Sequence, residues 1–269
     1  GIEKKGLGDG PKNPYWRLKM IEKFKYLTNR KSFHIVMIIT IIAIIFFVVG
    51  ILILRYNVEG ETNMPFELTK ISVISSSDGI SKEAVDTRWN FDLYQYNDIY
   101  LYIDKNDDYD GTEAISSVLI NNIVVEGQNS DKVKIYKTDS EAEQQIYINE
   151  EENVVQEIVY TGGMESNLKN LEISNQGGLV SFRCSYDNLM EYATDDLEIN
   201  NQQLLSKAGI TNEQLQAKLT FDFTISTQSG KQYQTNISLD IPIGDVVGQG
   251  TTSEEITDMS DFIFKRIQN

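Results

Sequence analysis

The chain has 269 residues and a net charge of −16, a length that allows one large domain or two small ones. It contains one histidine, His34, and one cysteine, Cys184. This composition excludes an intramolecular disulfide framework. The chain after His34 contains no histidine. A Ser-His-Asp triad, a Cys-His pair and ordinary zinc catalysis are therefore excluded there.

The charge is distributed unevenly along the chain. Residues 1–33 contain nine Lys or Arg residues and three acidic residues, a net charge of +6. The remainder contains 15 basic and 37 acidic residues, a net charge of −22. A basic head this short does not favour nucleic acid as a partner. The change of sign at residue 33 therefore needs another explanation, and the next segment provides one.

A run of 21 residues without a charged side chain, HIVMIITIIAIIFFVVGILIL, extends from His34 to Leu54. As an α-helix it would be about 31 Å long, which matches the hydrocarbon thickness of a bilayer. The run is longer than the apolar core of a typical signal peptide, and no small-x-small cleavage site follows it. Residues 34–54 are therefore predicted to form a transmembrane helix.

The charges that flank this helix predict its orientation. Nine basic residues precede it, while Arg55 alone follows it closely, and the more basic side of a span normally stays in the cytoplasm. We therefore expect residues 1–33 to be a basic cytoplasmic juxtamembrane segment beside the lipid bilayer. Residues 55–65 are expected to form a polar tether to an extracytoplasmic body at the cell membrane.

From residue 66 to residue 269 the sequence is typical of β-structure. Short runs rich in β-branched and aromatic residues are bounded by Gly, Asn, Asp and Ser. They include FELTKISVISS, which ends at the turn signal SDG, and also QQIYINEE and GGLVSFRCSY. In the last run Cys184 shares a face with Val180 and Phe182, so it is expected in the core.

The clearest pair of strands is LTFDFTISTQSGKQYQTNISLDIPI, in which apolar and polar residues alternate on both sides of QSGK. Gly230 can adopt a positive φ, so we predict an antiparallel hairpin with one buried face. A helical insert is predicted before it, where Thr211 and Gln214 have capping-box spacing. At the C-terminus, residues 262–264 (FIF) are expected to pack back on the body.

Together these elements predict a mainly β fold. An N-terminal transmembrane helix precedes an extracytoplasmic antiparallel β-sandwich, Ig-like or jelly-roll-like in topology, with a small helical insert. Residues 66–269 form either one acidic sandwich or two small sandwiches divided near residues 162–178, and the sequence leaves both arrangements open.

Two strings, NLEISNQGGLVSFR (residues 170–183) and ISLDIPIGDVVGQGTTSEEITDM (residues 237–259), follow the basic head and the single apolar run. In these features the chain resembles uncharacterised single-pass membrane proteins of Gram-positive bacteria. The resemblance covers most of the chain and implies a protein of the bacterial cell envelope. It implies no function and no site residues, because neither string is a catalytic signature.

The acidic stretch DKNDDYDGTE, residues 104–113, contains the candidate metal ligands. Asn106, Asp108 and Asp110 occupy the first, third and fifth positions of a calcium loop, with Gly111 at the sixth. Ser117 stands at the twelfth position, where a bidentate Glu belongs, so we expect no EF-hand. We favour a solvated hairpin loop and no cofactor, while a weak calcium site on this acidic body stays open.

The tyrosine-rich stretch RWNFDLYQYNDIYLYID, residues 88–104, contains the candidate ligand-binding residues. In an extended chain Tyr94, Tyr96, Tyr100 and Tyr102 lie on one face, opposite the apolar residues expected in the core. Their rings could form a platform for a glycan or a partner protein, or another part of the chain could cover them. Residues 97 and 98 are expected at a hairpin turn that pairs the two halves of this platform.

Three functions fit the sequence. The first is a non-enzymatic envelope protein whose anchored β-sandwich binds a protein or glycan, as an accessory subunit of a membrane assembly. The second is a cell-wall hydrolase that uses paired carboxylates. The third is a sensor with a cytoplasmic domain that precedes Gly1. We favour the first, without enzymatic activity, because no residue pattern in the chain points to a reaction.

Overall fold

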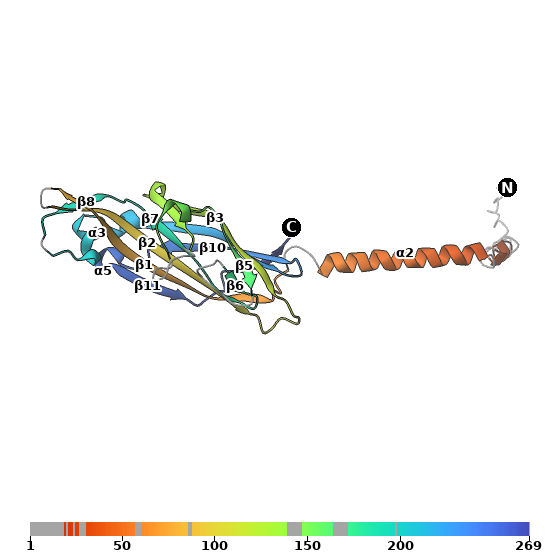
Figure 1. The fold of residues 1–269 in the computed structure, drawn as a ribbon. Helices are drawn as coiled ribbons and strands as arrows, with labels where there is room; N and C mark the ends of the chain where they lie inside the picture. Colours follow the sequence, from red (N-terminus) through yellow and green to blue (C-terminus); the bar gives the residue numbers. More distant parts are fainter. Residues whose placement is uncertain are drawn as a thin grey trace, which may run out of the picture. The chain divides into compact units, whose positions relative to one another are not determined.

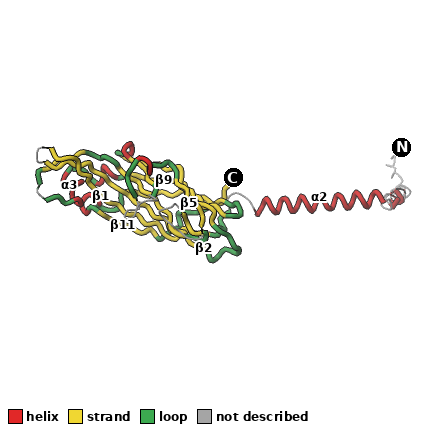
Figure 2. Tube along the Cα trace, in the orientation of Figure 1, coloured by secondary structure: helices red, strands yellow, loops and turns green. Residues whose placement is uncertain are grey.

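The computed structural model describes residues 19, 21–23, 25–26, 31–56, 61–85, 88–138, 147–163, 172–196 and 198–268. The chain divides into two compact units, Gly1–Val58 and Glu59–Asn269. The first unit is helical and the second is mainly β (Figures 1 and 2).

The first unit contains one long helix, α2 (Lys31–Tyr56). Its window Phe33–Ile51 has a mean hydropathy of 3.0, and no part of that window is buried. Within the described ranges, α2 is the one helix long and apolar enough to cross a membrane. The prediction of an apolar helix over residues 34–54 is confirmed, although the helix is slightly longer at both ends.

The second unit contains two sheets. Sheet A has the strand order β11 (Thr251–Ile256), β1 (Phe66–Val85), β2 (Arg88–Lys105), β7 (Gly178–Tyr186) and β4 (Val133–Tyr136), with β8 (Glu191–Thr194) also paired to β2. Sheet B has the order β12 (Lys265–Ile267), β10 (Gln232–Ile241), β9 (Ala217–Thr227), β3 (Ile115–Gly127), β5 (Ile158–Gly163) and β6 (Glu172–Ser174). Neighbouring strands are antiparallel except for the parallel pair β5 and β6. The prediction of a mainly β, antiparallel fold is thus confirmed, and both sheets include strands from either side of residues 162–178.

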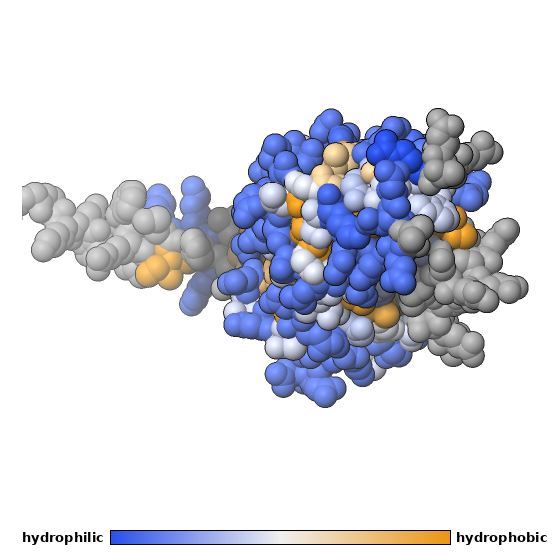
Figure 3. Space-filling view, turned by 90° about the vertical axis from the view of Figure 1, so that its left-hand side faces the viewer, coloured by the Kyte–Doolittle hydropathy of each residue, from blue (hydrophilic) through white to orange (hydrophobic). Residues whose placement is uncertain are grey.

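Short helices connect the strands. They are η1 (Ser130–Lys132), η2 (Glu151–Asn153), η4 (Asn201–Gln203), α3 (Leu204–Lys207), α4 (Asn212–Leu215) and α5 (Val246–Gln249). The capping box that the sequence predicts is present at the start of α4, where Thr211 and Gln214 each bond the other's backbone. The end of the unit that carries β8, α3 and α5 has a mainly hydrophilic surface (Figure 3).

The two sheets share one core because apolar and polar residues alternate along their strands. Leu219, Phe221, Phe223 and Ile225 of β9 are fully buried. Phe221 meets Phe182 of β7 edge to face, with ring centroids 5.1 Å apart, so this contact joins sheet B to sheet A. Full burial of each such side chain stabilises the folded state by roughly 1.5–3 kcal/mol relative to leaving it exposed.

Two local predictions in this core are confirmed. β9 and β10 form the expected hairpin, paired from Ala217–Ile241 to Ser226–Gln232, and Gly230 has a φ of 85° in the turn. Cys184 on β7 is fully buried.

The turn predicted at SDG is wrong. β1 continues through residues 77–79 because β2 pairs with it at each of these positions. Gly79 allows close packing instead of a turn: a Cβ added there would lie 2.4 Å from Cδ1 of Leu204 on α3.

The hairpin turn predicted at residues 97 and 98 is also wrong, since both lie in the middle of β2. Asn97 pairs with Ser75 of β1 and Cys184 of β7, and its side chain is fully buried on the core face. Its Oδ1 accepts a hydrogen bond of 2.7 Å from Ser75 Oγ, and its Nδ2 donates one of 2.9 Å to Gln95 Oε1. A polar side chain satisfied in this way can occupy a strand interior.

A third correction concerns QQIYINEE. Residues 147–150 have no regular secondary structure and are followed by η2, so the strand prediction is wrong there. Residues 144–146 lie outside the described residues.

The segments at the two ends of this unit contact the sheets. Met64, predicted in the tether, is buried, and the backbone N–H of Arg266 donates to the carbonyl of Glu61 at 2.8 Å. Residues 61 and 64 therefore contact the second unit, to which they belong. In the tail Phe264 packs against Phe223, as expected, but Ile263 is 59% exposed and does not pack.

We expect Asn97→Ala to lower the free energy of unfolding by about 1–3 kcal/mol, because Ser75 and Gln95 would lose a buried partner. Denaturant unfolding of the full chain in detergent, followed by circular dichroism, measures this change. Asn236→Ala, on the exposed side of β10, is the matched control and should cost less than about 0.5 kcal/mol. Equal losses in the two variants would contradict a special role for the buried amide.

Candidate functional site

The candidate site lies on the outer face of sheet A, where β2 and β7 run side by side. Asp98 of β2 pairs with Arg183 of β7, and Tyr96 and Tyr100 occupy the neighbouring positions of β2 on the same face. Directly opposed residues of an antiparallel pair point to the same side of the sheet. Strand register therefore brings together two charges that are 85 residues apart in the sequence.

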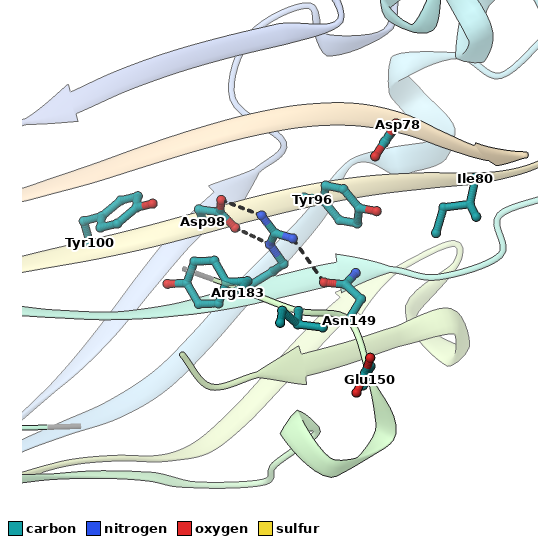
Figure 4. Close-up of a pocket in the computed structure, with 10 residues that line it drawn as sticks. Asp78, Ile80, Tyr96, Asp98, Tyr100, Asn149, Glu150 and Arg183 are labelled. Carbon is teal, nitrogen blue, oxygen red and sulfur yellow. Dashed lines mark hydrogen bonds and ion pairs between the residues drawn. The ribbon is translucent and has the colours of Figure 1, made fainter. Parts of the chain in front are cut away.

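Asp98 and Arg183 form a bidentate ion pair. Nε of Arg183 lies 2.6 Å from Oδ1 of Asp98, and Nη2 lies 2.9 Å from Oδ2 (Figure 4). The third guanidinium nitrogen, Nη1, donates to Oδ1 of Asn149 at 3.1 Å. Both charged side chains are largely buried, 15% and 12% exposed, so the pair holds the segment around Asn149 against sheet A.

Two tyrosine rings contact the same guanidinium. Cζ of Arg183 lies 4.3 Å from the ring centroid of Tyr96 and 4.8 Å from that of Tyr147. Both rings are buried, Tyr96 at 8% and Tyr147 at 3% exposure. Burial therefore raises the pKa of both phenols well above their ordinary value, and they stay neutral at physiological pH.

A cavity of about 550 Å³ opens beside this cluster, and we call it the sheet A pocket. Its lining is Asp78, Ile80, Tyr96, Asp98, Tyr100, Tyr147, Ile148, Asn149, Glu150 and Arg183. Asp78 and Ile80 come from β1, whereas Asn149 and Glu150 come from the segment that precedes η2 (Figure 4). The pocket thus combines aromatic walls with polar groups from four separate parts of the chain.

The four candidate tyrosines have different positions in this arrangement. Tyr96 and Tyr100 line the sheet A pocket. Tyr94 packs beside Tyr96, with centroids 6.0 Å apart, and its hydroxyl donates to Oδ1 of Asn188 at 2.8 Å. Tyr102 lies farther along β2 beneath Lys70, whose Nζ is 4.3 Å from the ring centroid. The four side chains share one face of β2, but only two of them reach the pocket.

The three candidate metal ligands lie in the loop after β2. Asn106 uses its side chain to close the loop: Nδ2 donates to the carbonyl of Met64 at 2.9 Å, and Oδ1 accepts from the backbone N–H of Asp108 at 3.0 Å. Asp108 and Asp110 are exposed. In the described part of the chain, no group of three or more His, Cys, Asp or Glu is arranged to hold a metal ion. The weak calcium site stays a prediction.

The chemistry that this arrangement favours is binding. Both carboxylate oxygens of Asp98 accept hydrogen bonds from Arg183, so this carboxylate is held in an ion pair within the protein. The aromatic rings and fixed polar groups instead present a preformed surface of the kind that ligand pockets use.

The sequence contained a signal for part of this site that its periodicity did not reveal. Arg183 lies in the otherwise uncharged run GLVSFRCSY, and Asp98 lies in the aromatic run of β2. Charges inside strands of this kind are normally paired, so the two could have been matched. Asp78, Tyr147 and Glu150 gave no such signal, because their position depends on tertiary packing.

Comparison with known proteins finds no match to this chain among family models, curated proteins or solved structures. The resemblance to single-pass membrane proteins of Gram-positive bacteria stays a prediction.

We expect Arg183→Met to lower the free energy of unfolding by about 3–5 kcal/mol, because it leaves the largely buried Asp98 without a counter-charge. The double variant Asp98→Asn/Arg183→Met should lose much less stability than Arg183→Met alone, because it also removes the unpaired negative charge. Denaturant titrations of the full chain measure both. Arg88→Met is the control: it breaks the exposed ion pair with Asp195 and should cost less than about 1 kcal/mol. A similar loss for Arg88→Met and Arg183→Met would contradict the structural role of the buried pair.

A second prediction concerns alkaline pH. Burial, and then the charge of Asp98, raises the pKa of Tyr100 to about 12, whereas an unfolded tyrosine has a pKa of about 10. The stability that comes from keeping this phenol neutral is complete below about pH 10 and is lost as the pH rises towards 12. Tyr100→Phe should therefore leave the denaturation midpoint at pH 7 nearly unchanged. Between pH 10 and 12 the midpoint should fall less in this variant than in the unsubstituted protein. An equally steep fall of the midpoint in both proteins would contradict a raised pKa for Tyr100.

Proposed function

We propose that this protein is a membrane-anchored, non-catalytic protein of the bacterial cell envelope. Its extracytoplasmic β-sandwich binds a partner through the sheet A pocket. The observation that carries the proposal is the pocket itself, in which the rings of Tyr96 and Tyr147 contact a largely buried, bidentate Arg183–Asp98 pair.

The properties of α2 support the anchor. Its apolar window, Phe33–Ile51, has no buried portion, as expected of a helix whose natural solvent is lipid. A core helix of a water-soluble domain would bury one face instead. The basic residues before the helix favour a cytoplasmic N-terminus and an extracytoplasmic second unit.

The path of the chain between the sheets supports the sandwich. The connection from β2 to β3 leads from sheet A to sheet B, and that from β3 to β4 leads back. The neighbours β2–β7 and β3–β9 are distant in sequence. Such crossings between two packed antiparallel sheets are typical of Ig-like and jelly-roll-like sandwiches.

The rigidity of the pocket supports binding as its role. Ion pairing and stacking fix the side chains of Arg183, Asp98 and Tyr96 before any ligand arrives, so little conformational entropy is lost when one binds. Anchoring adds a second advantage. A body confined near the membrane meets neighbouring envelope components at a high effective concentration, which suits an accessory subunit of a membrane assembly.

The anchor is tested by fractionation of cells that express the full chain. We expect the protein in the membrane fraction after a high-salt wash, with release by detergent only. Protease added to intact cells should digest the second unit. Replacement of Ile42 and Ile45 by Arg should release the protein or block its insertion, whereas replacement of both by Leu should change nothing. A soluble protein, or a second unit protected from external protease, would overturn the proposal.

The binding role is tested by a photoreactive diazirine amino acid placed at Tyr100 in intact cells. We expect a covalent adduct from this position, and none from the same probe at Asp240, an exposed position of sheet B. Mass spectrometry of the adduct identifies the partner as peptide or saccharide. Equal labelling from both positions, or none from Tyr100, would show that the sheet A pocket is not the contact surface.

A further inference from the structure

Strand β3 of sheet B is paired along its whole length on one side but only in part on the other. β9 pairs with it from Ile115 to Gly127, whereas β5 pairs with it only from Ser117 to Ile120. Within the described residues no other strand pairs with residues 121–127 on the β5 side, and no loop supplies a backbone hydrogen bond there. This half of β3 therefore presents an unpaired strand edge, along which every second residue directs its N–H and C=O outward.

The path of the chain before β5 leaves this edge uncovered. The backbone N–H of Val155 donates to the carbonyl of Ile135 on β4 at 2.9 Å, so the segment first lies against sheet A. Only at Ile158, opposite Ile120, does it join β3 in sheet B. A cavity of about 720 Å³, which we call the edge pocket, lies between residues 121–123, β4 and residues 154–157. Its apolar lining comprises Ile123, Val133, Ile135, Val154 and Val155.

The edge pocket also contains an unused hydrogen-bond acceptor. Oδ1 of Asn121, which lines the pocket, is buried and accepts no hydrogen bond from the described chain. A buried acceptor without a donor costs about 1–3 kcal/mol, so a ligand that donates an N–H to it would remove this cost. Three residues along the same edge, Val124 is 47% exposed. The edge thus combines unpaired backbone groups, an unsatisfied acceptor and apolar side chains.

An extended polypeptide matches these three features together. Addition of an extended peptide to an exposed sheet edge uses backbone hydrogen bonds for affinity and pockets for alternate side chains for specificity. Residues 59–269 contain 14 basic and 37 acidic residues, a net charge of −23. This charge opposes pairing with a second copy of the chain and favours a partner segment with basic side chains at its exposed positions.

A second unpaired edge in sheet B provides an internal comparison. β12 pairs with β10 only from Gln232 to Gln234, so residues 235–241 have no strand on that side within the described chain. The exposed side chains of this edge are all polar: Asn236, Ser238 and Asp240. It therefore offers backbone groups without the exposed apolar side chain that β3 carries.

We propose that the free edge of β3, residues 121–127, receives an extended peptide segment of a partner protein as an added strand of sheet B. The peptide places an apolar side chain in the edge pocket and donates an N–H to Asn121. This surface is separate from the sheet A pocket and goes beyond the function proposed for that pocket.

Fluorescence anisotropy tests the inference on the full chain in nanodiscs of uncharged lipid, with empty nanodiscs as the blank. The probe is a labelled eight-residue peptide of alternating Val and Lys. Its control is the same peptide methylated at every backbone amide, which keeps all side chains and charges but cannot donate backbone hydrogen bonds. We expect saturable binding of the unmethylated peptide only.

Hydrogen exchange followed by mass spectrometry locates the bound peptide. We expect slower amide exchange in residues 121–127 when the peptide is present, and no change in residues 235–241. Asn121→Ala should weaken binding by about threefold or more, since one hydrogen bond to the peptide is lost. It should leave the denaturation midpoint of the free protein unchanged or higher, because the acceptor has no partner there. Asn236→Ala, the same substitution on β10, should leave the Kd within about twofold.

Four results would overturn the inference: absence of saturable binding, equal binding of the methylated peptide, equal protection of residues 121–127 and 235–241, or equal losses of affinity in the two alanine variants. Protection of residues 121–127 that rises with protein concentration in the absence of peptide would assign the edge to a second copy instead. Photocrosslinking from Tyr100 does not involve β3, so either proposal can fail while the other stands.

Discussion

The ion pair between Asp98 and Arg183 is the interaction on which the candidate site depends. Strand register places the two charges opposite each other, and the segment around Asn149 then removes them from water. A buried pair of this kind contributes little net stability compared with apolar packing, but removal of one partner is costly. Its role here is positional, because Arg183 also contacts the rings of Tyr96 and Tyr147 and donates to Asn149.

β2 connects this site to the core. It pairs with β1 on one side and with β7 and β8 on the other, and its two faces have different roles. The inner face contributes apolar side chains and the hydrogen-bonded Asn97 to the shared core. The outer face contributes Asp98 and the tyrosines. Because successive residues of a strand point in opposite directions, a shift of register by one residue would destroy core and site together.

Charge is distributed very differently in the two units. The apolar helix α2 follows a basic segment, whereas the second unit is strongly acidic. A strong single-signed field keeps a displayed domain soluble and selects among the molecules that approach it. Within the second unit, the sheet A pocket holds aromatic rings and carboxylates side by side in its lining.

The sequence by itself determined the elements whose signals are local. The apolar helix follows from an uncharged run, the β9–β10 hairpin from alternation around Gly230, and the start of α4 from its capping box. It also placed Cys184 in the core, because side-chain direction in a strand has a period of two. These features depend on neighbouring residues alone, so the order of residues is enough to specify them.

Only the tertiary structure decided the rest. SDG and residues 97–98 have the composition of turns, but pairing with neighbouring strands keeps both in extended conformation. Which tyrosines reach the pocket depends on where the segment around Asn149 crosses sheet A, and that contact joins residues distant in sequence. The strand propensities of different residues span only about 1 kcal/mol. Hydrogen bonds and burial contributed by remote segments can therefore keep turn-like residues in a strand.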